Sequence, residues 1–349
     1  MSKVLPRLRH LLEEGLAGLR PKSAEQRRHE ADVHRAVEQV VDQVNPRLRA
    51  VSGYRRRLFP VVEKTLAYAG ELAARAPEPL LFDRQRWAQD PRVNALFGDL
   101  EGMRRVLTGP EVRRFLRDRP LGGDCYAVLA SAPDLRTQLG MELAGETIRR
   151  DVRQTTLSFA DHEVLLPSES EQELRRRLAA LATETLVGIA VEDILLREAR
   201  ITELDDRLRI VRIKARALEA RSRGAAFDPA GGSAQLREAA SLRARAGELE
   251  QEQELAGARA GLEGLEDYLD RLIERLARPE DRLSLKEVRL RLDRMNIVRA
   301  GGTDADSNEI VFHRVQRGDA PARVIHLIRF PRSELLEDRE RLRGIETYL

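Results

Sequence analysis

Cysteine is nearly absent from this sequence of 349 residues, where it occurs once, as Cys125. One cysteine excludes an intramolecular disulfide and a cysteine-based zinc site, and such sparing use is typical of a reducing compartment. Cys125 lies in an apolar segment, so we expect an inert, buried thiol.

Aromatic residues and long uncharged runs are also scarce. Aromatics make up 4% of the chain and charged residues 34%, a composition typical of long helices with much solvated surface and a modest core. The longest run without a charge, residues 125–133, is far shorter than the roughly 20 residues that span a bilayer. The N-terminus carries charges every few residues and has no apolar signal core. These absences predict a cytoplasmic protein.

Charge of one sign does not dominate either. The chain has 61 basic and 58 acidic residues, a formal charge of +3, so no global field draws the whole protein onto nucleic acid. Only five of the basic residues are lysines. We interpret the excess of arginine mainly as a bias of coding composition.

A heptad-like pattern of apolar residues is the clearest feature that is present. Its spacing of three and four residues is a coiled-coil signature. The pattern runs through Val187, Ala190, Ile194, Ile201, Leu204, Leu208, Val211, Ala215 and Leu218, and resumes at Leu255, Ala258, Leu262, Leu265, Leu269, Leu272 and Leu276.

The break in this pattern, residues 224–233, contains three glycines and a proline, which end one helix and permit a reversal. We therefore predict a long antiparallel coiled-coil hairpin over residues 169–278, with arms of roughly 75 Å. One continuous rod is the alternative. The heptad register slips between Leu249 and Leu255, which predicts a weakly paired stretch.

The N-terminal region, residues 1–119, reads as a helical region. Residues 2–20 form a candidate amphipathic helix, which we expect to dock on protein, with a membrane surface as the alternative. Ser23 should begin the next helix and Asn45–Pro46 should interrupt it. A further helix is expected over residues 54–76. Shorter helices should begin at Asp83, Asp90–Pro91 and Gly109–Pro110.

Residues 120–168 show alternating apolar and polar positions with turn signals at Pro133–Asp134 and Ala144–Gly145, which predicts a small antiparallel β meander. In residues 279–349, Ser284 and Glu287 form a capping box and predict a helix. Two strands should follow, over residues 310–315 and 324–330. The fold class that we expect is mainly α, with an N-terminal helical bundle, a small antiparallel sheet in an α+β body, and the hairpin inserted into that body.

No catalytic constellation is visible. Asp161-His162-Glu163 places three potential metal ligands in a row, but neighbours on a strand point to opposite faces. The run from Asp304 to Asn308 lacks the glycine and the final glutamate of a calcium loop. His313 and His326, on adjacent expected strands, are two ligands without a third. No phosphate-binding loop occurs. We predict no enzyme, cofactor or metal.

One arginine cluster resembles a nucleic-acid or lipid footprint, because it holds five positive charges and no acid. Its members are Arg47, Arg49, Arg55, Arg56 and Arg57. Against this interpretation, the whole chain is rich in arginine, and the aromatic interleaving that stacks bases is missing. Solvated helix faces or salt bridges explain the cluster more simply.

An acidic run lies where the heptad register slips. We take it as the candidate partner-binding part of the hairpin; its members are Glu248, Glu250, Glu252 and Glu254. The function that the sequence favours is therefore a non-enzymatic cytoplasmic scaffold or adaptor, which binds a protein partner or itself through the coiled coil. The alternative is binding to nucleic acid or anionic lipid through the arginine-rich N-terminal half.

Overall fold

The computed structural model describes residues 23–117, 123–144, 147–224, 229–260, 264–299 and 307–336. The chain divides into two compact units. A helical unit comprises residues 1–64 and 194–274, and a sheet unit comprises residues 65–193 and 275–349. The expected amphipathic helix over residues 2–20, most of the loop before Asn308 and the last 13 residues lie outside the described residues.

The N-terminal part of the helical unit begins where the sequence predicts. Ser23 caps α2, because its Oγ accepts a hydrogen bond from the Gln26 amide at 3.1 Å and the Gln26 side chain accepts one from the Ser23 amide at 3.0 Å. Asn45 then starts a 3₁₀ turn by accepting from the Arg47 amide. The elements are α2 (Ala24–Val44), η1 (Pro46–Ala50) and α3 (Tyr54–Arg75).

The expected hairpin of two long arms is wrong. The long helix α8, Glu171–Gly224, is a single unbroken helix of 54 residues. The chain that follows it forms two shorter helices, α9 (Pro229–Ala260) and α10 (Leu265–Leu276). The heptad pattern predicted one coiled-coil partner along the whole helix. That prediction was wrong because the first part of α8 packs in the sheet unit, and only its later part belongs to the helical unit. No helix in the described ranges has the length and hydropathy of a membrane span.

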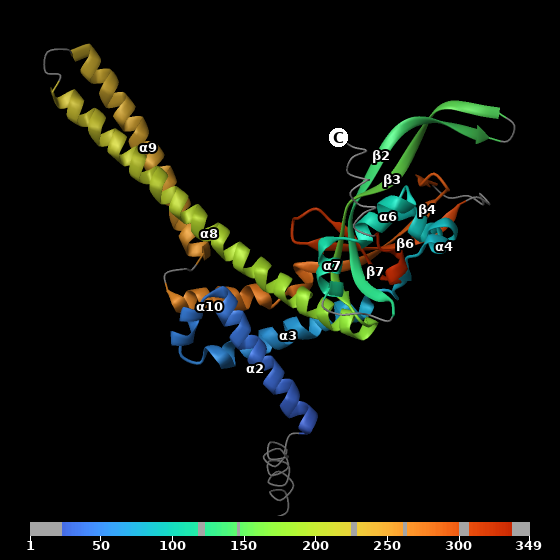
Figure 1. The fold of residues 1–349 in the computed structure, drawn as a ribbon. Helices are drawn as coiled ribbons and strands as arrows, with labels where there is room; N and C mark the ends of the chain where they lie inside the picture. The colour runs from blue at the N-terminus through green and yellow to red at the C-terminus, as the bar shows by residue number, and fades with distance from the viewer. Residues whose placement is uncertain are drawn as a thin grey trace, which may run out of the picture. The chain divides into compact units, whose positions relative to one another are not determined.

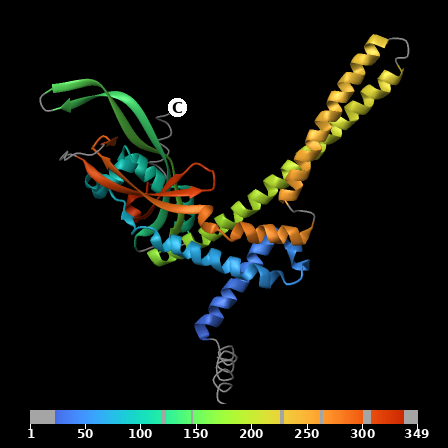
Figure 2. The same cartoon turned by 180° about the vertical axis from the view of Figure 1, so that it is seen from behind.

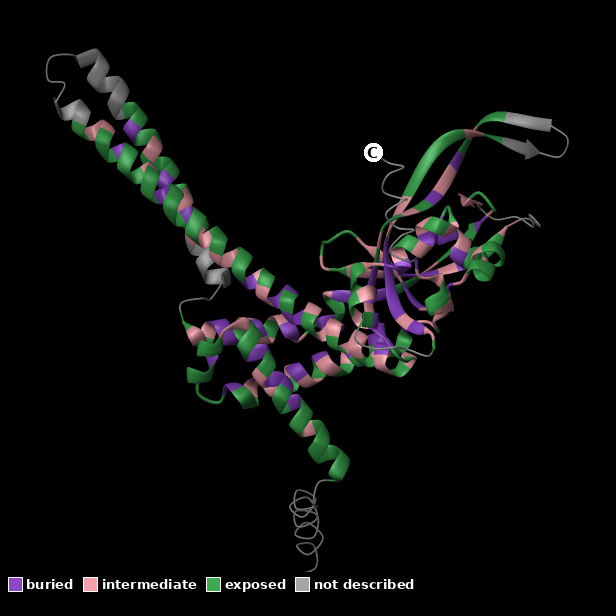
Figure 3. Cartoon of the chain, viewed as in Figure 1, coloured by how far each residue is buried: buried purple, intermediate pink, exposed green. Residues whose placement is uncertain are grey.

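The later part of α8 buries one side of the helix. Leu204, Leu208 and Ala215 are buried there, as are Ala239 and Ala246 of α9. Figure 3 shows these buried positions along α8 and α9, with exposed residues on the outer sides. Polar contacts join the two helices at Arg200–Glu252, Arg212–Glu250, Arg243–Glu219 and Gln253–Asp205.

The small antiparallel sheet that we expected is also wrong. The sheet unit contains a seven-stranded mixed sheet in the order β1-β7-β2-β3-β5-β4-β6, and β6 also pairs with β7. The pair β1–β7 is parallel and the other pairs are antiparallel. Figure 1 shows this sheet. The strands are β1 (Leu80–Leu81), β2 (Cys125–Ala144), β3 (Thr147–Ser168), β4 (Leu283–Leu292), β5 (Ile297–Val298), β6 (Asn308–Arg317) and β7 (Arg323–Phe330).

Two local interpretations fail for physical reasons. Pro133–Asp134 is no turn: β2 runs through it, and Pro133 pairs with Phe159 of β3. The predicted helix after Ser284 is strand β4, because the segment pairs along its whole length with β6, a partner that the local capping signal could not reveal. Leu283 and Leu285 pack on one face of this strand, and Leu290 and Leu292 pack on the other. After β7 the chain forms a 3₁₀ turn, η3, at Arg332–Glu334.

Helices cover both faces of the sheet. On one face, Ala127, Leu129, Ile328 and Phe330 pack against residues of the short helices. These helices are α4 (Arg84–Gln89), α5 (Pro91–Leu96), α6 (Leu100–Leu107) and α7 (Pro110–Arg117). On the other face, the alternate residues Val128 and Leu327 pack with Ala76 and Leu174, which follow α3 and begin α8. Strands β2 and β7 therefore lie between two apolar layers.

Beyond the sheet, β2 and β3 continue as a two-stranded ribbon, which Figure 2 shows from behind. Its outer part is exposed, and three large apolar side chains of β2 face solvent there: Leu135, Leu139 and Met141. The backbone of Gly140 lies close to the Gln154 side chain: a Cβ atom here would lie 2.1 Å from Oε1 of Gln154 and would displace this side chain, whose amide donates to the Met141 carbonyl.

Candidate functional site

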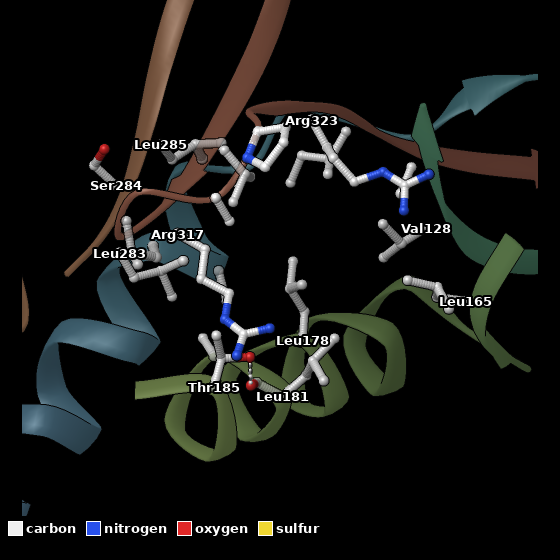
Figure 4. Close-up of a pocket in the computed structure, with 18 residues that line it drawn as sticks. Val128, Leu165, Leu178, Leu181, Thr185, Leu283, Ser284, Leu285, Arg317 and Arg323 are labelled. Atoms are coloured by element: carbon white, nitrogen blue, oxygen red, sulfur yellow. Dashed lines mark hydrogen bonds between the residues drawn. The ribbon is translucent and has the colours of Figure 1, made fainter. Parts of the chain in front are cut away.

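The sheet unit contains an apolar pocket between one face of the sheet and helices α3 and α8 (Figure 4). Its volume is about 360 Å³, within the range of about 300–1,000 Å³ that is usual for small-molecule sites. Five strands contribute to the pocket, namely β2, β3, β4, β6 and β7, mostly through alternate residues, because side chains two apart share a face. The apolar lining comprises Leu72, Ala73, Val128, Ala130, Leu165, Leu178, Leu181, Ala182, Leu283, Leu285, Val315, Ala320, Pro321 and Ile325.

Two arginines bring positive charge to this pocket. Arg317 ends β6 and Arg323 begins β7. Figure 4 shows the Arg317 guanidinium beside Thr185 of α8 and the Arg323 guanidinium beside Val128 of β2, on different sides of the pocket. The turn between them is held by Gln316, whose amide nitrogen donates to the carbonyls of Gly318 and Ala320 at 2.8 and 2.6 Å. Both guanidinium groups therefore start from a fixed backbone.

Each arginine contacts one acidic side chain at the surface. Arg317 lies 3.2 Å from Glu192 of α8, and Arg323 lies 3.5 Å from Glu163 of β3. The side chains of Glu192 and Glu163 are 60% and 55% exposed, so these pairs contribute little stability. Arg323 also donates to the carbonyl of Asp161. Its Nε is buried and has no hydrogen-bond partner within the described part of the chain.

Sequence reasoning missed this pocket. Its lining comes from segments as far apart as Leu72 and Ile325, and the residues are mostly aliphatic, which any core would also use. The only local sign of the pocket in the sequence is the pair Arg317 and Arg323. They stand at the ends of two strands whose nearest residues on the same face, Val315 and Ile325, are apolar.

A second feature is an exposed apolar stripe on α8, which we call the α8 stripe and define as Leu195, Leu196, Ile210 and Ile213. Their exposed fractions are 53%, 64%, 51% and 57%. At 100° per residue, the four lie within about 100° of one another around the helix. The buried residues Leu204, Leu208 and Ala215 lie on the opposite side, whereas no described residue buries the four side chains of the stripe. Exposed Glu203 and Asp206 lie between its two pairs on the same side.

The predicted arginine cluster is partly engaged with acids of its own unit. Arg49 lies 3.2 Å from Glu38 and 2.7 Å from Asp42, and Arg55 lies 2.7 Å from Glu38. These arginines, with the Tyr54 hydroxyl, hold the pKa of the Glu38 carboxyl below its ordinary value; the hydrogen bond from Arg55 is the largest cause.

The other members of the cluster differ. Arg57 pairs with Asp270 of α10. Arg47 and Arg56 are exposed. The guanidinium of Arg55 also lies over the Tyr54 ring, 5.5 Å from its centroid. The structure thus brings the five arginines to one region but gives three of them carboxylate partners.

The predicted acidic run lies on α9. Glu250 pairs with Arg212 of α8, and Glu252 pairs with Arg200 at 2.5 Å. Glu248 is exposed, and the side chain of Glu254 lies outside the described residues. The run therefore faces α8 in part, and its role in partner binding stays a prediction.

The candidate metal residues do not converge. Across the described ranges, no three histidine, cysteine or acidic side chains are placed to hold an ion. A bulge near Asp161 lets His162 contact Ser131, with Nδ1 2.8 Å from Oγ, and stack on Phe97. His313 pairs with Ile325 across the strands, so His313 and His326 point to opposite faces of the sheet. Asp304 and Asp306 lie outside the described residues.

Cys125 is buried at 2% exposure, and burial raises the pKa of its thiol to about 11. Since the thiolate is the reactive form, we expect iodoacetamide to leave Cys125 unmodified in the native protein at pH 8 and to modify it fully in 6 M guanidinium chloride. Mass spectrometry of the intact chain measures both. Rapid native modification would contradict the burial of this strand.

Comparison with known proteins does not identify a family or a function for this chain. No protein-family model, no curated protein and no solved structure matches this chain. What the protein does must therefore be argued from the pocket, the α8 stripe and the charges around them.

Proposed function

We propose that this protein is a non-enzymatic cytoplasmic scaffold that binds a helix of another protein along the α8 stripe. The observation that carries this proposal is the exposure of four large aliphatic side chains on one side of a single long helix. Scattered exposed leucines are ordinary. Here two exposed pairs, Leu195 with Leu196 and Ile210 with Ile213, lie on one side of the helix about 21 Å apart, and a partner helix could use them as two apolar anchors.

The charged residues beside the α8 stripe indicate what charges the partner helix should carry. A shallow surface hollow beside Ile213 is lined by both signs of charge, from Asp205, Asp206, Arg209, Arg212 and Arg216. A partner helix with an apolar side and mixed flanking charges fits this surface. Nucleic acid and anionic lipid fit it less well, because two aspartates offset most of the charge of its three arginines and leave no strong positive field.

The alternative through the arginine-rich N-terminal half has less support. Arg49, Arg55 and Arg57 already contact carboxylates, so a phosphate must compete for them. Arg47 and Arg56 alone provide few contacts for an electrostatic interface.

Photocrosslinking tests the proposal. A photoreactive amino acid at position 213 should give a covalent adduct with one other protein in cells, whereas the same group at Met295, which is 76% exposed on a different surface, should give none. The double change Leu196→Gln and Ile210→Gln should remove the adduct. Two lost aliphatic contacts are worth about 3 kcal/mol, roughly a hundredfold in affinity.

The outcomes separate the possibilities. An adduct of twice the chain's mass would mean that the partner is a second copy of this chain and not another protein. No adduct at position 213, or an adduct that persists in the double variant, would contradict the proposal. The substituted residues are exposed, so loss of folding does not explain loss of the adduct; circular dichroism checks this.

A further inference from the structure

The apolar pocket of the sheet unit is not used by the proposed scaffold function. Most of the residues that line it, from the strands and from both helices, are apolar. Half-buried Leu178 and Leu181 of α8 keep part of their surface facing this space, as Figure 4 shows. An empty apolar space of this size loses dispersion contacts along its whole lining, so an apolar ligand would stabilise the unit.

The polar groups of the pocket define one end of that ligand. The hydroxyl of Thr185 is not free, because it donates to the Leu181 carbonyl at 2.7 Å. Arg323 has a buried Nε without a partner in the described structure, and a buried donor that lacks an acceptor costs free energy. The acceptor that best satisfies it is an anion, since a guanidinium binds carboxylate through two parallel hydrogen bonds.

Arg317 and Arg323 flank the same turn, but their guanidinium groups lie on different sides of the pocket (Figure 4). The carboxylate is therefore placed on Arg323, and the protein partner of Arg323 does not block it. Glu192 and Glu163 are both more than half exposed. Pairs of this kind exchange readily with water and with competing anions. A ligand carboxylate that is partly shielded by the pocket forms the stronger contact, because lower exposure strengthens the attraction between charges.

We propose that this pocket binds an amphipathic carboxylate, a medium-chain fatty acid, with its hydrocarbon chain between the sheet and helices α3 and α8 and its carboxylate on Arg323. The pocket's apolar walls and the buried Nε of Arg323, which has no partner among the described residues, carry this assignment. Scaffold binding through the α8 stripe does not depend on it.

Titration calorimetry of the full chain with sodium dodecanoate below its micelle concentration tests the proposal. Dodecanoate should bind at one site per chain, and dodecanol should bind at least tenfold more weakly. Arg323→Met should weaken dodecanoate binding about tenfold, because it removes a charge-assisted contact. Arg317→Met should weaken it much less, because that guanidinium lies on another side of the pocket. Neither variant should change the affinity for dodecanol.

Two further variants make the test specific. Arg314→Met, an exposed position on β6 whose side chain lies on the other face of the sheet, should leave binding unchanged. Thr185→Phe should fill the space and abolish binding while the native circular dichroism spectrum is kept. Absence of dodecanoate binding by the intact protein would overturn the proposal. Equal binding of dodecanol, or an equal effect of Arg314→Met, would overturn the role of Arg323.

Discussion

Acid should unfold the sheet unit well before its carboxylates are all protonated, because His326 is buried in a neutral form. Its ring is 3% exposed and its Nε2 has no hydrogen-bond partner within the described residues. Burial, together with the nearby charges of His313 and Arg92, lowers the pKa of His326 to about 3. In the unfolded chain the pKa is the ordinary value of about 6.5.

The sign of the effect follows from proton binding. Between pH 6.5 and about 3 the unfolded chain binds a proton at His326 that the folded chain does not, so the free energy of unfolding falls as the pH falls through this window. The loss is about 3 kcal/mol between pH 7 and pH 4. His162 and His313, whose pKa values burial also lowers, act in the same direction.

Urea unfolding followed by the fluorescence of Trp87 measures this loss. Trp87 belongs to the sheet unit, where its Nε1 donates to the Phe97 carbonyl at 3.1 Å. His326→Phe removes the titrating group and keeps an aromatic ring beside Phe312, so it should flatten the pH dependence. The exposed control His34→Phe should not. An unchanged slope in His326→Phe would contradict the buried neutral state.

The sequence predicted those elements whose signals are local. Ser23 begins a helix and caps it with Gln26, as expected. Asp83 and Asp90 likewise cap the short helices that we predicted. These successes share a cause: a capping side chain satisfies backbone amides within three residues of itself, so the signal and the structure lie together in the chain.

The errors arose where distant segments decide the structure. Ser284 carries a capping signal, yet it lies in β4, which pairs along its length with β6. Pro133 carries a turn signal, yet β3 continues the ladder past it. The apolar pattern of α8 predicted one partner along its length, whereas its first turns pack on the sheet. In each case tertiary pairing overrides local preference.

The candidate sites show the same division. The arginine cluster and the acidic run are contiguous in sequence and were visible there, but their ion pairs, such as Arg57 with Asp270, join residues far apart in the chain. The pocket was not visible, because Leu72, Val128, Leu283 and Ile325 meet only in the folded sheet unit. The α8 stripe was hidden because exposure cannot be separated from burial when apolar residues occur on both sides of a helix.

Replacing Arg175 should cause one of the largest losses of stability in the sheet unit. This residue near the start of α8 donates to three carbonyls at the end of α3: those of Ala73 and Ala76 at 2.9 Å each, and that of Pro77 at 3.2 Å. The last carbonyls of a helix have no partner within the helix. Arg175 supplies their hydrogen bonds and its positive charge suits the helix C-terminus.

Arg175→Met keeps the length of the side chain and removes its donors. We expect the free energy of unfolding to fall by about 3 kcal/mol or more, since each buried carbonyl left without a donor costs about 1–3 kcal/mol. The neighbour Arg176 is exposed, so Arg176→Met should change the free energy by less than about 0.5 kcal/mol. Urea unfolding monitored by Trp87 compares the two variants. Equal stabilities would mean that water replaces the guanidinium, and that α3 does not depend on α8 for its C-terminal cap.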